Sequence, residues 1–269
     1  MAADIPPFNS SFAYQNTLPP NPQWTYGQKI TETPEGMAWM KGEEEGWKVV
    51  DTAKEDKFKL YQLMISGIVP RPIAFVSSIS ESGVENLAPF SWFNMVSHNP
   101  PLVSICCSDG PQRLKDTAAN IKATKSFTVN IISEPFIESA NVTSVDAPEG
   151  VSEWPISALT KEKSIHVKPA RVKESAFSME CELFQSIDIA DPASGAHTTT
   201  MILGHVKYIH VRNDMLDERG NVDPAKFRPV GRMGDITYSR VGDGFRLTRP
   251  AWAKEQETIE KAIEGRGDE

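Results

Sequence analysis

The chain has 269 residues, of which 39% are hydrophobic and 24% are charged, and its formal net charge is −8. This length can bury a substantial core, and the acidic total argues against a nucleic-acid-binding protein, which normally carries a basic face. No stretch approaches the roughly 18 apolar residues of a membrane-spanning helix, and the first residues lack the basic start and apolar core of a secretory signal.

The cysteines and histidines argue against a disulfide framework and against a metal site. Three cysteines do not make a disulfide framework, and adjacent Cys106 and Cys107 must face opposite sides of a strand. We therefore expect a reducing, cytoplasmic location. The five histidines are scattered without a metal-binding motif, so no metal site is expected.

Residues 1–53 are predicted to form an extended arm. Prolines recur there too often for a long helix, yet aromatic residues are too frequent for a solvated tail. The arm would wrap its own domain or a partner subunit, and partial disorder is the alternative. The aromatic residues concerned are Phe8, Phe12, Tyr14, Trp24, Tyr26, Trp39 and Trp47.

Residues 54–250 show many strand-like runs and few helical ones. Because strands and helices do not alternate regularly, a parallel doubly wound sheet is not expected, and the pattern predicts an antiparallel barrel. A turn is expected at 80–83 and a hairpin turn at 191–195. The predicted strands are 73–79, 88–97, 102–107, 127–132, 176–189, 197–211 and 244–247. The predicted helices are 54–66, 116–123 with Asp116 as N-cap, 135–141 and, beyond the domain, 252–266, ending at Arg266.

The segment Lys115-Asp116-Thr117 offers an anion site at the start of a helix. Lys115 supplies charge, Thr117 supplies a hydroxyl, and the first helical N–H groups point outward. A phosphate is the anion that such a set would hold. The alternative is an ordinary helix cap beside a solvated lysine.

Two predicted strands offer polar groups for the rest of a flat, phosphorylated ligand. In the second strand, Ser91 and Asn94 interrupt an apolar run, although Pro89 also suits a plain edge strand. In the first strand, Ser77 and Ser78 are candidate hydroxyls, and Arg71 is a cation beside a rigid turn. The alternative for Arg71 is a surface ion pair.

The ordered motifs resemble a known family. R-P-I-A-F-V-S-S, N-L-A-P-F-S-W-F-N, K-D-T-A-A-N-I and P-V-G-R-M-G-D-I-T-Y look like the flavin reductase-like, FMN-binding split barrels, over about residues 60–250. The resemblance implies a mainly β fold, an antiparallel Greek-key split β-barrel with a few peripheral helices. It also implies a homodimer with FMN near the subunit boundary.

The resemblance further implies site residues. The implied FMN contacts are Ser77, Ser78, Asn86, Ser91, Trp92, Asn94, Lys115 and Thr117, with Arg71 and Ile73 as further candidates. His205 and Tyr238 are implied to approach the cofactor or the second substrate, and His205 is the candidate catalytic residue. By its position alone, on a strand with apolar neighbours, His205 is by default a core or interface histidine, and a role near the flavin is the secondary interpretation.

The implied activity is hydride transfer from NADH or NADPH to the flavin, in which positioning supplies most of the catalysis. The sequence shows no nucleophile elbow, phosphate loop or Rossmann glycine motif. One alternative is an FMN-binding electron carrier without a nicotinamide site. The other is a non-enzymatic split barrel that serves assembly. No nucleic-acid or membrane partner is expected.

Overall fold

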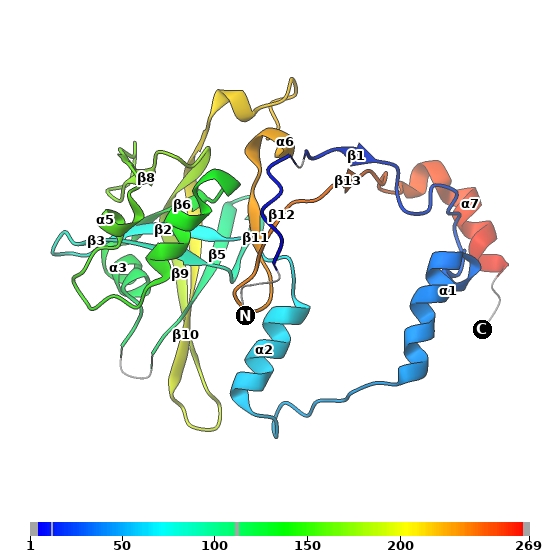
Figure 1. Cartoon of the computed structure of the whole chain (residues 1–269), viewed down its shortest axis with the longest axis horizontal. Helices are drawn as coiled ribbons and strands as arrows, with labels where there is room; N and C mark the ends of the chain where they lie inside the picture. The colour runs from blue at the N-terminus through cyan, green and yellow to red at the C-terminus, as the bar shows by residue number, and fades with distance from the viewer. Residues whose placement is uncertain (1–4, 12, 111–112, 266–269) are drawn as a thin grey trace. The chain divides into compact units, whose positions relative to one another are not determined.

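A seven-stranded antiparallel sheet forms the centre of the computed structural model, with strand order β3-β2-β6-β9-β10-β5-β4 (Figure 1). The model describes residues 5–11, 13–110 and 113–265. The predicted strands in this domain are confirmed within a few residues at their ends, except the second. The bounds are β2 Ala74–Ile79, β3 Glu85–Phe90, β4 Phe93–His98, β5 Pro101–Ser108, β6 Ser126–Ile131, β9 Phe177–Ala190 and β10 His197–Val211.

The prediction of one strand over 88–97 is wrong. The chain bends at Ser91 and Trp92, and the two pieces, β3 and β4, lie at opposite edges of the sheet. Pro89 suits an edge because it has no N–H to donate to a second neighbouring strand. Since the two edge strands are joined by this two-residue corner, the sheet curls back toward itself. The mainly β, antiparallel split barrel is thus confirmed.

The barrel interior is apolar and tightly filled. Ile202 and Val206 of β10 point inward, and between them Gly204 leaves space for Phe127, whose ring would lie 2.4 Å from an added Cβ atom. Burial of such side chains is the main force that stabilises the sheet. The cluster consists of Ala74, Val76, Val103, Ile105, Ile121, Phe127, Val129, Met179, Cys181, Ile202 and Val206.

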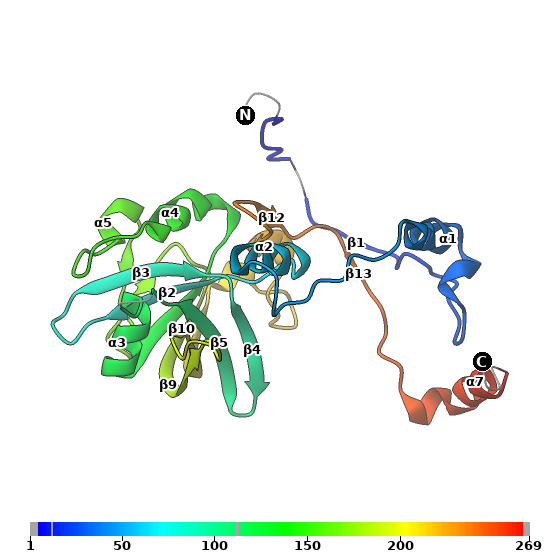
Figure 2. The same cartoon turned by 90° about the horizontal axis from the view of Figure 1, so that it is seen from below.

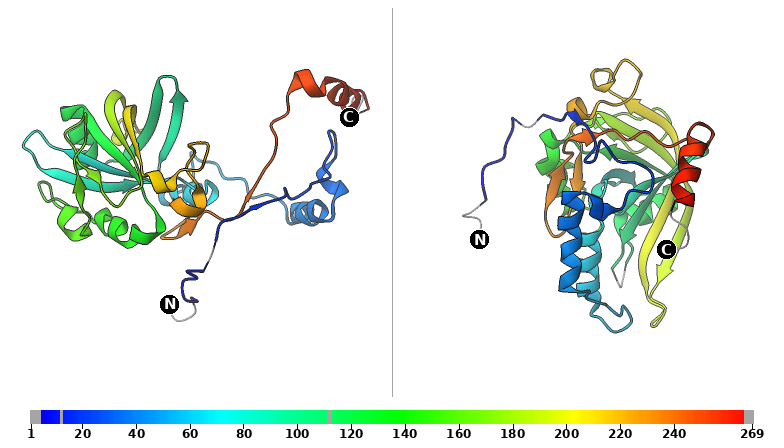
Figure 3. Two further views of the ribbon diagram at one scale, coloured as in Figure 1. Left: turned by 90° about the horizontal axis from the view of Figure 1, so that it is seen from above. Right: turned by 90° about the vertical axis from the view of Figure 1, so that its right-hand side faces the viewer.

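Helices cover β2 and β3 on two sides. α3 (Asp116–Thr124) adds Ile121 to the interior cluster, whereas α4 (Ile137–Asn141) and α5 (Trp154–Ser157) cover the outer face around Phe75 and Trp154. Figure 2 shows α3 on one side of these strands and α4 and α5 on the other. The long β9–β10 hairpin reaches beyond the rest of the sheet (Figures 1 and 3).

The start of α3 differs from the prediction. Lys115, not Asp116, is the N-cap residue, and its side chain makes no cap hydrogen bond. The backbone N–H of Lys115 instead donates to Asp109 Oδ1 at 2.7 Å, and Asp116 pairs with Arg113 at 2.8 Å. A carboxylate from a neighbouring loop therefore anchors the helix start.

The elements outside the seven-stranded sheet and α3 are mostly short. The predicted helix 54–66 is α2 (Lys57–Gly67), and 135–141 becomes a 3₁₀ turn followed by α4. A hairpin of β11 (Val230–Arg232) and β12 (Tyr238–Arg240) was not predicted, because three-residue strands leave no clear alternation. The others are η3 Glu134–Phe136, η4 Val142–Ser144, β7 Lys161–Glu162, β8 Arg171–Val172, η5 Asn213–Met215 and α6 Pro224–Phe227.

The chain divides into two units, Tyr61–Val241 and Met1–Leu60 together with Gly242–Glu269. In the second unit the arm pairs with the C-terminal segment. β1 (Asn16–Thr17) runs parallel to β13 (Gly244–Phe245), and Tyr26 Oη donates to Glu255 Oε2 at 2.5 Å.

This second unit also contains helices. The arm is not extended throughout, because Thr33 accepts from the Gly36 N–H and so caps a short helix. The bounds are η1 Ile30–Glu32, α1 Pro34–Met40, η2 Lys41–Glu45 and α7 Trp252–Glu264. Phe12 and Arg266, which figured in the predictions, lie outside the described residues. Across the described chain, the helices are too short or too polar to span a membrane.

Candidate functional site

Two adjoining pockets follow the outer side of β3 and share Pro89 and Ser144. The first, here the Lys115 pocket, lies among β3, the start of α3 and residues 143–147. The second, here the Arg232 pocket, lies among the end of α2, the corner at Ser91 and the β11–β12 hairpin. Together they make one groove with a cationic group at each end.

Exposed cations mark the Lys115 pocket. Lys115 Nζ lies 3.1 Å from Asp146 Oδ1, and Arg113 Nη2 donates to the Ala147 carbonyl at 3.3 Å. The hydrogen bond from Lys115 and its charge lower the pKa of Asp146. Asp146 itself is 85% exposed, and ion pairs in such positions contribute little to stability. An incoming anion can therefore replace the carboxylate.

A buried network of polar side chains joins the start of α3 to the strands beside this pocket. Thr117 Oγ1 donates to Asn86 Oδ1 at 2.6 Å, and Asn86 Nδ2 donates to Glu153 Oε2 at 2.9 Å. Asn120 Nδ2 donates to Ser78 Oγ at 3.1 Å. Burial raises the pKa of Glu153, although the Leu87 N–H and Asn86 oppose the rise. The network fastens α3 to β2 and β3.

Asp109 fixes the helix start to β10. Its side chain is fully buried, and besides Lys115 N–H it accepts from Thr200 Oγ1 at 2.7 Å and lies 2.8 Å from His197 Nε2. A buried carboxylate is stable only when it is well hydrogen-bonded, as it is here. The sequence prediction missed Asp109, because nothing local distinguishes it from a loop residue.

Arg71 lies in the Arg232 pocket, and its guanidinium donates hydrogen bonds mainly to protein oxygens around it. Its guanidinium donates to the carbonyls of Ile65, Ile68 at 2.8 Å and Met233 at 2.9 Å, and to Ser91 Oγ at 3.4 Å. Burial, and then the charge of Arg232, lower its pKa. Arg71 is therefore not in a surface ion pair: these four bonds tie α2, the corner and the β11–β12 hairpin together, and its predicted contact with FMN stays a prediction.

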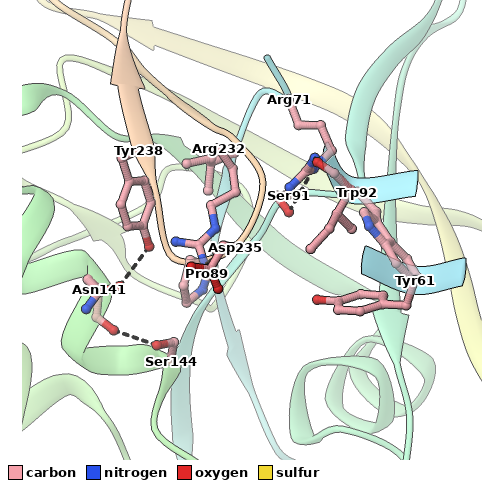
Figure 4. Close-up of a pocket in the computed structure, with 12 residues that line it drawn as sticks. Tyr61, Arg71, Pro89, Ser91, Trp92, Asn141, Ser144, Arg232, Asp235 and Tyr238 are labelled. Carbon is pink, nitrogen blue, oxygen red and sulfur yellow. Dashed lines mark hydrogen bonds between the residues drawn. The ribbon is translucent and has the colours of Figure 1, made fainter. Parts of the chain in front are cut away.

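Aromatic rings form two walls of the Arg232 pocket, with Arg232 between them (Figure 4). Arg232 lies over the Tyr238 ring at 4.5 Å, and Tyr238 Oη donates to Asn141 Oδ1 at 2.8 Å. On the other wall, the Tyr61 and Trp92 rings are 6.4 Å apart, centre to centre. These walls leave a slot for a planar group.

Asn94 and His205 lie away from the groove. Because Ile202 and Val206 face the interior, Leu203 and His205 point to the outer face of β10. Leu203 pairs with Ser104, which pairs with Asn94, so Asn94 shares that outer face. Neither residue lines either pocket, and their predicted roles stay predictions.

The structure brings together most of the other predicted residues. The groove is lined by Arg71, Ile73, Asn86, Ser91, Trp92, Lys115, Thr117 and Tyr238. Ser77 and Ser78 lie buried on β2 and line neither pocket. The lining residues that were missed include Tyr61, Arg113, Asn141, Ser144, Arg232 and Asp146. Among the described residues, no cluster of His, Cys, Asp or Glu could hold a metal ion.

Comparisons with known proteins agree with this architecture. The chain is 40% identical to a protein of Aquifex aeolicus over 183 residues. This matched region covers 68% of this chain and 90% of that protein. Nitrilotriacetate monooxygenase component B from Bacillus cereus matches with a TM-score of 0.72 and 29% identity, over 75% of this chain and 99% of that one. The 2-nitrobenzoate 2-nitroreductase of Pseudomonas fluorescens matches with a TM-score of 0.67 and 28% identity, over 76% and 98%. Residues 66–230 match the flavin reductase like domain, and the chain therefore belongs to that family.

Proposed function

We propose that this protein is an FMN-dependent oxidoreductase that transfers a hydride from NADH or NADPH to the flavin. The observation that carries the proposal is the groove beside β3, which leads from a cationic helix start along the small and apolar surface of Ala88, Pro89 and Phe90. Family membership and the similarity to a monooxygenase component and a nitroreductase support a flavin-linked redox role.

The donor set of the Lys115 pocket fits a phosphate. Lys115 and Arg113 would provide the charge, and the pocket lies at the start of α3, a nine-residue helix whose dipole favours an anion there. Lys115 now contacts an exposed carboxylate that a phosphate dianion can displace, whereas Arg113 also pairs with Asp116 on α3 and would keep that bond. Thr117 and Asn86 hold each other, so they would act mainly by keeping the helix start in place.

The β3 edge fits a flat ring system. Ala88, Pro89 and Phe90 line the groove with small or apolar surface, and Ser91 adds a hydroxyl at the corner. Bound FMN would supply the two-electron chemistry, which no side chain here provides. The chain itself would bind the phosphate, orient the ring along β3 and exclude water from the ring.

We also propose that the protein is a homodimer. The outer face of β9 and β10 carries Ile187 and Ile189, which are 40% and 41% exposed, beside Met201 and Leu203. An apolar sheet face of this kind is typical of an interface. Asn94 and His205 share it, so a second copy would cover both. A solution mass of one chain would contradict the dimer.

The visible spectrum of the purified protein, before and after each nicotinamide nucleotide, tests the proposed activity. We expect a yellow protein that bleaches with NADH or NADPH when oxygen is absent. A yellow protein that is inert toward both would instead be an electron carrier. A colourless protein that ignores added FMN would leave only an assembly role.

Replacement of Lys115 tests the phosphate site. Lys115→Ala removes a charge-assisted contact and should weaken FMN binding by about 1–3 kcal/mol, or roughly 5- to 150-fold. Lys122→Ala is the matched control, because Lys122 lies on the same helix but pairs with Asp188 outside the groove. Equal FMN affinity of both variants in a fluorescence titration would remove Lys115 from the site.

A further inference from the structure

Arg232 and Arg71 share one pocket but differ in how their donors are used. The four protein oxygens around Arg71 come from three chain segments, and the residue is only 7% exposed. Arg232 is half-buried, and its described bonds go to the carbonyls of Asp235 at 2.8 Å and Ile236 at 3.3 Å. A guanidinium has five N–H donors, so Arg232 keeps donors for a ligand in the pocket.

The charge of the pocket favours an anion. Among its described lining residues, Arg71 and Arg232 are cationic and Asp235 is the one carboxylate, which leaves one net positive charge. The planar fork of a guanidinium matches a carboxylate in a bidentate pair, and its stacking on Tyr238 holds the plane of the fork in place.

The walls of the pocket favour a flat aromatic body on that anion. Trp92 is 39% exposed, and its ring is tilted by 58° to Tyr61, across the pocket from Tyr238 (Figure 4). Aromatic rings prefer offset or edge-to-face contacts with other rings, and both walls offer such surfaces. A ring whose carboxylate meets Arg232 would thus extend toward Trp92.

We infer that the Arg232 pocket is a separate binding site for a small planar aromatic carboxylate, held by Arg232 and by the rings of Trp92 and Tyr238. The inference rests on the proposed function, because the acid would lie beside the end of the groove that receives the flavin ring. The phosphate end of the groove, at Lys115, takes no part in binding it.

Calorimetric titration of the full chain with benzoate tests the inference, with uncharged benzamide as the matched ligand. Benzoate should bind, benzamide should bind at least tenfold more weakly, and Arg232→Gln should weaken benzoate binding at least tenfold. Arg232→Lys keeps the charge but loses the fork and should fall between the two. Arg240→Gln is the matched control, because it removes an arginine from the same hairpin outside the pocket and should bind benzoate as the unchanged protein does.

The fold of the variants can be checked independently. The backbone of Arg232 pairs with that of Arg71 through two hydrogen bonds of 3.0 and 2.8 Å, which the Gln variant keeps. Trp92→Leu, on the other wall, provides a second variant and should also weaken benzoate binding severalfold. Equal benzoate affinity of the unchanged protein and Arg232→Gln would overturn the inference.

Measurements with FMN separate the two proposals. Arg232→Gln should keep its FMN affinity within about threefold, and Lys115→Ala should keep its benzoate affinity. If Arg232→Gln loses FMN as strongly as benzoate, the pocket belongs to the flavin itself and the inference is wrong. If Lys115→Ala binds FMN normally, the proposed phosphate site fails while the benzoate result still stands.

Discussion

The two ends of the groove hold positive charge in opposite ways. At one end, Lys115 contacts the exposed carboxylate of Asp146, and Arg113 contacts Asp116 and a loop carbonyl. At the other, Arg71 is buried and its partners are mainly carbonyls of the pocket wall. Exposed contacts are cheap to exchange for a ligand, whereas a buried cation that satisfies several acceptors cannot leave them without a large loss. A cation near a pocket is therefore a ligand contact only if its donors can be released.

Removal of Arg71 should have the largest effect. Arg71→Met leaves three carbonyls without their charged donor, and we expect the free energy of unfolding to fall by about 3 kcal/mol or more. Urea denaturation measures this change. Lys115→Met is the matched control, with an expected change under about 0.5 kcal/mol for an exposed side chain. Equal losses in the two variants would contradict the contrast between the two ends.

The same contrast applies to carboxylates, and Glu180 is the buried example. Burial alone would raise its pKa, but hydrogen bonds from the N–H groups of Ile165, His166 and Val167 and from His210 outweigh burial and lower the pKa to about 2. A lowered folded-state pKa stabilises the protein above the unfolded-state value of 4.5, and that stabilisation is lost as the pH falls toward 2.

Glu180→Gln should therefore remove about 2 kcal/mol of stability at neutral pH. It should also flatten the decline in the free energy of unfolding between pH 4.5 and pH 2. Urea denaturation at several pH values measures both effects. An unchanged acid decline in the variant would show that Glu180 does not carry this pH dependence.

Replacement of the exposed carboxylate should have the smallest effect. Asp146→Asn removes the group that now competes for Lys115, so FMN should bind about two- to fivefold more tightly. Thermal unfolding without ligand should not change measurably. Weaker FMN binding in Asp146→Asn would mean that the carboxylate orients Lys115 rather than competing with its ligand.

The sequence sufficed for the long elements and for the polar residues near β3. Alternation and turn residues located β2, β9 and β10 within a residue or so, because a buried face imposes its period on the chain. Apolar alternation across Ser91 hid the corner, because it does not show which partner strand each half meets. The β11–β12 hairpin was missed because its three-residue strands leave no clear alternation, and its pairing with Arg71, 161 positions earlier in the chain, leaves no local signal.

Residues that line the groove were predicted where their chemistry is local and missed where it is not. Lys115 and Thr117 were identified because a helix start concentrates their groups. Arg71 lines the groove, but its bonds to backbone carbonyls and to Ser91 Oγ come from three segments that no local pattern reveals. Arg232 and Tyr61 line the pocket because the β11–β12 hairpin and α2 pack beside the corner, which no local pattern predicts.

The corner at Ser91 and Trp92 restricts where residues can be inserted into or deleted from the chain. It joins the first and last strands of the sheet, so one inserted or deleted residue there would shift one edge against the other. The same shift would separate Pro89 in one half of the groove from Trp92 in the other. Length variation is therefore tolerable at exposed hairpin tips such as 191–195, whereas the two-residue connection must keep its length for the groove to exist.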